Sequence, residues 1–140
     1  MKNREQLTAN LFLDEYIPKE LYLKYQKNPL ILAGLIDRQM VRADQLLRNQ
    51  FGPVTINNWW NDGDRQWSGL RTIDSPDFSE TSQHTFGRAS DKIFKDVIVW
   101  EVCKYIKKNW RVLGITCIEQ NVSWVHSDVR TYKDYKLLIV

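Results

Sequence analysis

The sequence has little of the residue types that cross-link a chain or carry it through a membrane. Only two of its 140 residues are cysteines, Cys103 and Cys117, which are too few for a disulfide framework or a cysteine-built metal site. Both lie among apolar residues and are expected to be buried thiols. No apolar run approaches the ~20 residues that a membrane-spanning helix needs, and the first residues lead into no apolar segment of the signal-peptide type. We therefore expect a protein made in a cytoplasm, with no membrane partner.

The charges are nearly balanced, which excludes a strongly basic or strongly acidic protein. Lys and Arg number 20 and Asp and Glu number 17, so the net charge is +3. Both signs are mixed along the chain, which is typical of ordinary solubility, although a mild positive charge also suits an acidic polymer. Because the basic residues are dispersed and no recognised nucleic-acid motif occurs, nucleic-acid binding ranks last among the functions considered, and we expect no nucleic-acid partner.

Length and composition indicate one soluble domain over residues 1–140. Hydrophobic residues make up 43% and charged residues 26%, enough to bury a core without disulfide bonds. Apolar spacing predicts two helices, the first ending at Gly52 and Pro53. Short turns between β-branched runs favour an α+β fold, a mostly antiparallel sheet flanked by helices. The expected helices cover residues 30–51 and 94–109, and the expected strands cover residues 54–56, 112–118, 122–129 and 136–140.

A long segment without periodicity, residues 57–81, separates the first expected strand from the rest. It is dense in Gly, Asp, Ser and Trp. A compact domain rarely keeps such a loop without a use for it, so we interpret it as a loop that builds a site. Its tryptophans, Trp59, Trp60 and Trp67, either pack the loop and core or line a groove for a peptide or sugar. The others, Trp100, Trp110 and Trp124, are expected to pack in the core or on the sheet.

The chain has only two histidines, and each has a carboxylate nearby in sequence. His84 and Asp91 are seven positions apart and can converge if the chain bends at Gly87. His126 and Asp128 share a face if they lie on a strand. Two histidines and one carboxylate are a common ligand set for catalytic zinc. Spacing alone is equally compatible with histidines that have structural roles.

Two motifs carry more information than this spacing, Ser82-x-His84-x-x-Gly87-x-Ala89-x-Asp91 and Trp124-x-His126-x-Asp128. Together, over roughly residues 13–130, the chain resembles the zinc D-Ala-D-Ala carboxypeptidase family. That family includes vancomycin-resistance dipeptidases and bacteriophage endolysin peptidases, and it shares its fold with the hedgehog signalling domain. The resemblance implies that fold and one zinc ion (Zn2+) bound by His84, Asp91 and His126. It also implies that Asp128 lies behind the ligands and orients a histidine.

The resemblance also implies residues that contact substrate. Arg71 stands where relatives hold an arginine near the substrate, so it is predicted to bind substrate and to stabilise the oxyanion, with Arg65 as the reserve. The alternative is that either arginine pairs with an aspartate of the loop, Asp62, Asp64 or Asp74. Ser82 and Trp124, both within the motifs, are predicted to bind substrate.

The general base is the least clear position. Many relatives place an acidic residue three positions before the second histidine, where this chain has Ser123. Glu119, seven positions before His126, is therefore the predicted base, as in some relatives. Its alternative role is that of a solvent-facing turn residue.

These residues predict a zinc metallopeptidase that hydrolyses peptide bonds in peptidoglycan stem peptides, of the phage lysin or virion-associated type. The alternative is a non-catalytic zinc-binding module of the same fold, such as a phage structural protein, because retained ligands without a base would leave a metal that stabilises the fold. The expected partner is a peptidoglycan peptide, met at the bacterial cell wall. We expect a monomer, acting alone or within a phage particle.

Overall fold

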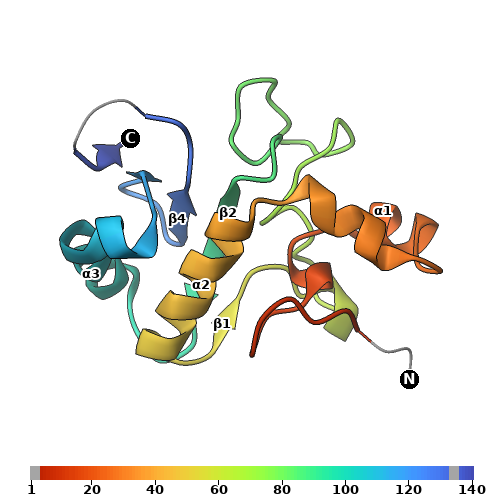
Figure 1. Ribbon diagram of the computed structural model, residues 1–140, viewed down its shortest axis with the longest axis horizontal. Coiled ribbons are helices and arrows are strands. Elements are labelled where there is room, and N and C mark those ends of the chain that lie inside the picture. The colour runs from red at the N-terminus through yellow and green to blue at the C-terminus, as the bar shows by residue number, and fades with distance from the viewer. Residues whose placement is uncertain (1–3, 133–135) are drawn as a thin grey trace.

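A five-stranded sheet packed against two long helices forms the centre of the protein (Figure 1). A computed structural model describes residues 4–132 and 136–140. Its helices are α1 (Lys19–Lys24), α2 (Arg38–Phe51) and α3 (Val99–Leu113), and its 3-10 turns are η1 (Leu13–Glu15), η2 (Pro29–Leu35) and η3 (Trp59–Asn61). Its strands are β1 (Val54–Thr55), β2 (Ala89–Phe94), β3 (Cys117–Ile118), β4 (Val125–Asp128) and β5 (Leu138–Ile139). The expected α+β class is therefore confirmed.

The sheet is mixed rather than wholly antiparallel. Its strand order is β1-β2-β4-β3-β5. The pairs β1–β2, β2–β4 and β3–β4 are antiparallel, whereas the edge strand β5 runs parallel to β3. The prediction of a mostly antiparallel sheet is thus confirmed for every pair except the last.

The first predicted helix is two elements. Residues 30–51 were expected to be continuous, but the 3-10 turn η2 ends at Leu35 and α2 begins only at Arg38. Asp37 causes the break, because its side chain accepts a hydrogen bond from the backbone N–H of Gln39 at 2.7 Å and so caps a new helix. The end of the helix was predicted correctly, since Gly52 follows Phe51 with a φ of 86°.

The second predicted helix was placed too early in the chain. It was expected over residues 94–109, but α3 covers Val99–Leu113, and Phe94 belongs to β2. The strand expected from Val112 is correspondingly shorter and begins at Cys117. Trp100 was expected in the core and is instead 62% exposed on α3. Apolar residues at a strand end and on a helix face look alike in a single sequence, which explains these shifts.

The strand β2 was not predicted, although it is the one that positions the site. Its residues were interpreted as a bend with close backbone packing. They instead form a strand that is buried at every position except Ile93. A strand covered on both faces lacks the alternation of apolar and polar residues that reveals a half-exposed one.

The two faces of the sheet differ in chemistry. The face under α2 and α3 is apolar over most of its area. Side chains alternate along β4, so that Val125 joins this core while His126 points to the other face.

Cys117 is buried, and burial raises the pKa of its thiol to about 12. Among the described residues, no helix is long and apolar enough to cross a membrane. The main core contains Ala43, Leu47, Phe94, Val102, Ile106, Leu113, Ile115, Ile118 and Val125.

Candidate metal centre

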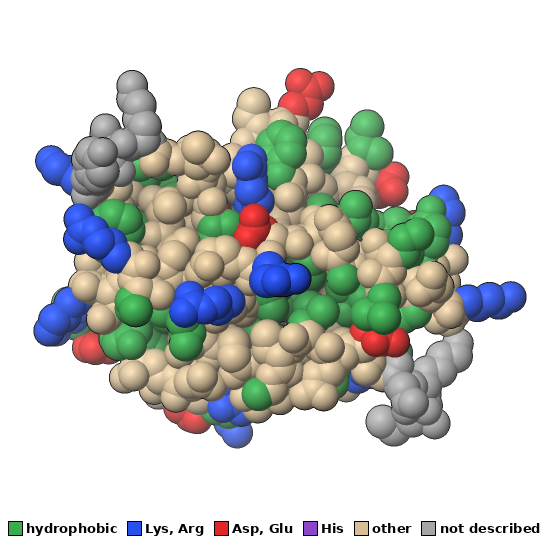
Figure 2. Space-filling model, in the orientation of Figure 1, with side chains coloured by type: hydrophobic (Ala, Val, Ile, Leu, Met, Phe, Trp, Pro, Cys, Tyr) green, Lys and Arg blue, Asp and Glu red, His purple; other side chains and the backbone are tan. Residues whose placement is uncertain are grey.

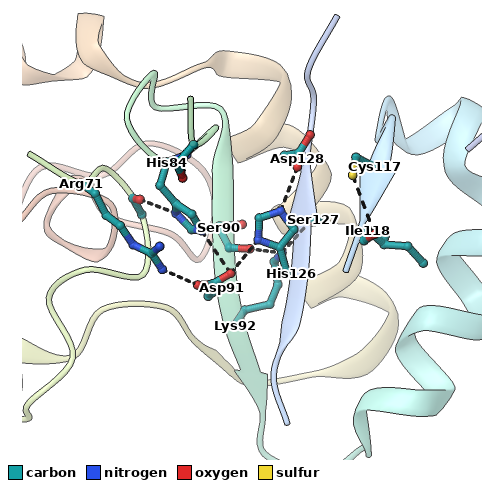
Figure 3. Close-up of polar contacts among 12 residues, drawn as sticks. Arg71, His84, Ser90, Asp91, Lys92, Cys117, Ile118, His126, Ser127 and Asp128 are labelled. Carbon is teal, nitrogen blue, oxygen red and sulfur yellow. Dashed lines mark hydrogen bonds and ion pairs between the residues drawn. The ribbon is translucent and has the colours of Figure 1, made fainter. Parts of the chain in front are cut away.

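Two neighbouring strands bring Asp91 and His126 to one point of the sheet. Asp91 on β2 is the direct partner of His126 on β4 in their antiparallel register. Directly opposed residues point to the same face, with Cβ atoms about 5 Å apart. Figure 3 shows the two side chains meeting between the strands. The pairing of the strands thus joins two residues that are distant in sequence.

His84 reaches the same point from a loop. The segment before β2 is a series of turns, in which Thr85 N–H donates to Ser82 O at 3.0 Å and Gly87 N–H donates to His84 O at 3.3 Å. The Ser82 hydroxyl accepts a hydrogen bond from the backbone N–H of His84 at 3.3 Å. Ser82 therefore shapes the turn that presents His84. Its predicted contact with substrate stays a prediction.

Gly87 is the residue that lets this loop lie against the segment that joins η2 to α2. Its φ is 66°, a left-handed conformation that favours glycine. A Cβ at this position would collide with the backbone carbonyl of Leu35. The Gly87 carbonyl also accepts a hydrogen bond from Asp37 N–H at 2.8 Å. The bend expected at Gly87 is therefore present, and it anchors the histidine loop to the start of α2.

His84, Asp91 and His126 form a buried group that could hold a metal ion. One donor atom from each lies within 4.8 Å of the other two. Asp91 Oδ1 is 3.3 Å from His84 Nε2 and 2.8 Å from His126 Nδ1. A tetrahedral zinc ion with bonds of about 2.0–2.1 Å separates its ligand atoms by roughly 3.3 Å. The donor set could therefore hold a metal ion, and its residue types are ones that zinc uses.

Hydrogen bonds behind the two histidines set which ring nitrogen faces the cluster. His84 Nδ1 lies 2.7 Å from the carbonyl oxygen of Gly69, which can only accept, so Nδ1 carries the proton and Nε2 faces Asp91. His126 Nε2 lies 2.8 Å from Asp128 Oδ2, so its Nδ1 faces Asp91. The predicted orienting contact of Asp128 is therefore present. A ligand histidine bonded in this way to a carboxylate or carbonyl is a usual feature of metal sites.

The group keeps its carboxylates ionised. Burial alone would raise the pKa of Asp91, but hydrogen bonds from His126 and His84 bring it well below its ordinary value. Burial would likewise raise the pKa of Asp128, but hydrogen bonds from Arg130 and His126 lower it to about 2. His126 responds in the opposite sense, because hydrogen bonds to Asp128 and Asp91 outweigh burial and raise its pKa above 6.5. In the metal-free cluster the two carboxylates therefore favour the protonated form of His126, and a cation would compete with that proton for Nδ1.

Arg71 and Arg65 both contact Asp91, but at different atoms. Arg71 Nη2 lies 2.8 Å from Asp91 Oδ2, and its Nε donates to Trp67 O at 2.8 Å. Arg65 Nη2 donates to the backbone carbonyl of Asp91 at 3.2 Å. Arg71 thus holds the carboxylate oxygen that faces away from the histidines. The ion pairs named as its alternative, with Asp62, Asp64 or Asp74, do not form among the described residues.

Glu119 lies beside His126 on the next strand pair. Its backbone N–H donates to His126 O at 3.4 Å, which continues the β3–β4 pairing by one residue and puts Glu119 opposite His126. Glu119 also borders a surface cavity with Trp100 and Lys107 of α3. Within the described part of the chain its carboxylate forms no hydrogen bond or ion pair. The position of Glu119 opposite His126 favours the role of general base, whereas its place at the edge of a surface cavity favours that of a solvent-facing turn residue.

Trp124 precedes β4 and is half-buried. Its indole Nε1 is buried and has no hydrogen-bond partner among residues 4–132 and 136–140. A buried donor without a partner is uncommon in proteins. Because Nε1 is buried, it is not open to a substrate in this structure, and the predicted substrate contact of Trp124 stays a prediction.

Two contributors to the cluster were missed from the sequence. Arg130 donates to both oxygens of Asp128, from Nε to Oδ1 at 2.8 Å and from Nη2 to Oδ2 at 2.7 Å. Its position two residues after Asp128 could have indicated this contact, because alternate strand residues share a face. The carbonyl of Gly69 gave no signal, since any residue has one and only the fold directs it at His84.

Comparisons of the chain with protein-family models, with curated proteins and with solved structures find no match. The family resemblance therefore depends on the two motifs, and the metal centre depends on the geometry of their side chains.

Proposed function

We propose that this chain is a zinc-dependent peptidase that hydrolyses peptide bonds in peptidoglycan stem peptides. The observation that supports the metal is the convergence of His84 Nε2, Asp91 Oδ1 and His126 Nδ1, each held from behind by a hydrogen-bond partner. Three protein ligands leave one tetrahedral position for water, which distinguishes catalytic from structural zinc sites. The substrate class comes from the resemblance of the two motifs.

A bound zinc ion would lower the pKa of a coordinated water to about 7 and polarise a substrate carbonyl. The protein residues have the remaining tasks. Arg71 holds Asp91 Oδ2, the carboxylate oxygen that does not face the two histidines. Glu119 would accept a proton from water and return it to the leaving amine. Asp128 is a poor base near neutral pH, because Arg130 and His126 hold its pKa at about 2.

The proposal is tested by zinc content and peptidoglycan hydrolysis measured on the same samples. The wild-type protein is expected to hold close to one zinc ion per chain and to release peptides from purified peptidoglycan. His84→Ala should lose both properties. Gln50→Ala, at an exposed position of α2, serves as the control and should keep both. Absence of zinc from wild-type protein that has been purified without chelators and then offered zinc would refute the proposal.

The second candidate is a non-catalytic zinc module, favoured by Ser123 at the position where many relatives are acidic. The absence of carboxylate contacts at Glu119 among the described residues points the same way. Such a module would bind zinc through the same three side chains and would gain stability from it. Zinc in the wild-type protein without hydrolysis of any stem peptide would support this candidate.

Nucleic-acid binding receives little support from the surface. On the face shown in Figure 2, Lys and Arg side chains are scattered among neutral and hydrophobic ones rather than aligned in a stripe. A binding assay at two salt concentrations would test this function, because phosphate contacts make affinity strongly dependent on salt.

A further inference from the structure

A second polar group lies buried behind the metal centre, on the face of the sheet that α2 covers. It consists of Asp44 on α2, Ser90 and Lys92 on β2, Ser127 on β4, and Tyr16. Lys92 is 0% exposed and Asp44 is 1% exposed. Fully buried lysine and aspartate are rare unless they are paired. We call these five residues the Asp44–Lys92 cluster.

The members of the cluster are joined by short contacts. Lys92 Nζ lies 3.1 Å from Asp44 Oδ1 and donates to Ser127 Oγ at 2.7 Å and to Ser90 O at 3.2 Å. Asp44 Oδ2 accepts hydrogen bonds from Ser90 Oγ at 2.7 Å and from Tyr16 OH at 3.0 Å. The ammonium group thus donates two hydrogen bonds and Asp44 Oδ2 accepts two, whereas Asp44 Oδ1 has the ion pair with Lys92 and no hydrogen bond among the described residues.

The cluster is adjacent in sequence to the metal ligands. Ser90 and Lys92 flank Asp91 on β2, and Ser127 follows His126 on β4. Because side chains alternate along a strand, Asp91 and His126 point to one face of the sheet, and Ser90, Lys92 and Ser127 point to the other. The Lys92–Ser127 hydrogen bond therefore crosses between the two strands directly behind the pair that Asp91 and His126 form.

This arrangement is better explained by specificity than by stability. Burying two charges costs several kcal/mol of desolvation, and apolar residues of similar size often stabilise a protein as well or better. Tyr16 packs in an apolar core with Met40, Val41 and Ile56, so apolar residues in place of the charged pair would extend that core. A slip of β4 by one residue would turn Ser127 to the other face and leave the Lys92 ammonium without that partner. A polar pairing of this kind fixes which residues lie opposite one another.

We propose that Lys92 is a positioning residue for the metal centre. Through Asp44 and Ser127 it fixes the register and the close pairing of β2 and β4, so that Asp91 and His126 present their ligand atoms together. The inference rests on the proposed metal site. It predicts that zinc affinity depends on the Asp44–Lys92 cluster beyond any effect of the cluster on stability.

The test separates positioning from stability with two sets of variants. Lys92→Met leaves the Asp44 charge buried without its partner and should lower the midpoint of thermal unfolding. Asp44→Asn combined with Lys92→Met removes both charges and should restore most of that midpoint. Leu47→Ala, three residues after Asp44 on α2, lowers stability while leaving all five residues of the cluster in place.

A milder pair of variants covers the case in which Lys92→Met does not fold. Ser127→Ala removes the hydrogen bond between the strands while Lys92 keeps Asp44. Ser123→Ala makes the same chemical change at an exposed position of the same segment. Each folded variant is measured by competitive zinc titration, by the visible absorption of bound Co2+, which reports ligand geometry, and by hydrogen exchange of the β2 and β4 amides without metal.

The expected result is a loss of zinc affinity of about tenfold or more in the Asp44/Lys92 double variant and in Ser127→Ala, the range found when groups behind metal ligands are removed. Their Co2+ spectra should change, and the β2 and β4 amides should exchange faster. Leu47→Ala and Ser123→Ala should stay within about twofold of wild type in affinity. Wild-type affinity and spectrum in the double variant and in Ser127→Ala would overturn the inference. If wild-type protein binds no zinc, the proposed function fails, and unchanged amide exchange in these variants would separately overturn the inference.

Discussion

Zinc affinity should fall steeply as the pH is lowered, because protons compete with the metal ion for the ligand atom of His126. In the metal-free protein, His126 Nδ1 is 2.8 Å from Asp91 Oδ1 and His126 Nε2 is 2.8 Å from Asp128 Oδ2. Both neighbours are carboxylate oxygens, so the ring is stabilised with a proton on each nitrogen, and the pKa of His126 is raised above 6.5. A metal ion must displace the proton on Nδ1.

The size of the effect follows from this one proton. Below the pKa of His126, each unit of pH lost should weaken zinc binding at least tenfold, which corresponds to about 1.4 kcal/mol per unit. Asp128, with a pKa of about 2, and Asp91, with a lower one, stay ionised in this range and add nothing to the slope. Above the pKa of His126, its contribution to the slope should vanish.

The measurement is a competitive zinc titration against a chromophoric chelator between pH 5 and pH 8. Asp128→Asn serves as the comparison, because it removes one of the two carboxylates that raise the pKa of His126. In this variant the pH at which affinity levels off should move down, and the highest affinity should fall about 10- to 100-fold. An affinity that does not change between pH 5 and pH 6.5 in the wild-type protein would refute the reasoning.

Four further changes have expected outcomes. Glu119→Gln should keep zinc and lose about 100-fold or more in kcat, and unchanged turnover would remove Glu119 as the base. Arg71→Met should weaken zinc binding about 10- to 100-fold by titration, whereas unchanged affinity with a lower kcat/KM would assign Arg71 to the substrate alone. Gly87→Ala should lower the free energy of unfolding by about 1–3 kcal/mol in denaturant titrations, while Gly34→Ala, with nothing near the new Cβ, should not. The metal-free protein should lose about 2 kcal/mol of its free energy of unfolding as the pH falls from about 4 to about 2, because the pKa of Asp128 is about 2 in the fold against 3.8 in a free chain. If Asp128→Asn shows the same loss as wild type in an acid titration, this prediction is wrong.

The candidate ligands could be named from the sequence because the chemistry of metal binding restricts residue type. Only two histidines occur, and both lie in motifs with carboxylates. The structure brings His84, Asp91 and His126 together as the motifs predict. The partners behind them were harder to find. Asp128 was predicted, but the grip of Arg71 on Asp91 and of Arg130 on Asp128 depends on tertiary distances that spacing does not encode.

The fold was predicted in class but not in detail. The start of α2 was missed because the cap at Asp37 interrupts the apolar pattern, and α3 was placed too early because the end of β2 continues that pattern. The strand β2 was missed because Ser90, Asp91 and Lys92 look like a polar loop. Their burial is possible only because Asp44, from a helix far away in sequence, supplies the partner for Lys92. A polar strand of this kind cannot be recognised until its partner is known.

The N-terminal segment has a consequence for any attempt to shorten the protein. The carbonyl of Tyr16 accepts a hydrogen bond from the backbone N–H of Leu70 at 2.8 Å. The preceding residue, Gly69, accepts the hydrogen bond from His84 Nδ1 with its own carbonyl. Gly69 leaves no space there, since a Cβ would meet the backbone of Tyr16 at 2.5 Å. A chain trimmed to begin at α2 would keep all three candidate ligands and still lose the support of one of them. The smallest functional unit therefore includes the segment that precedes α1.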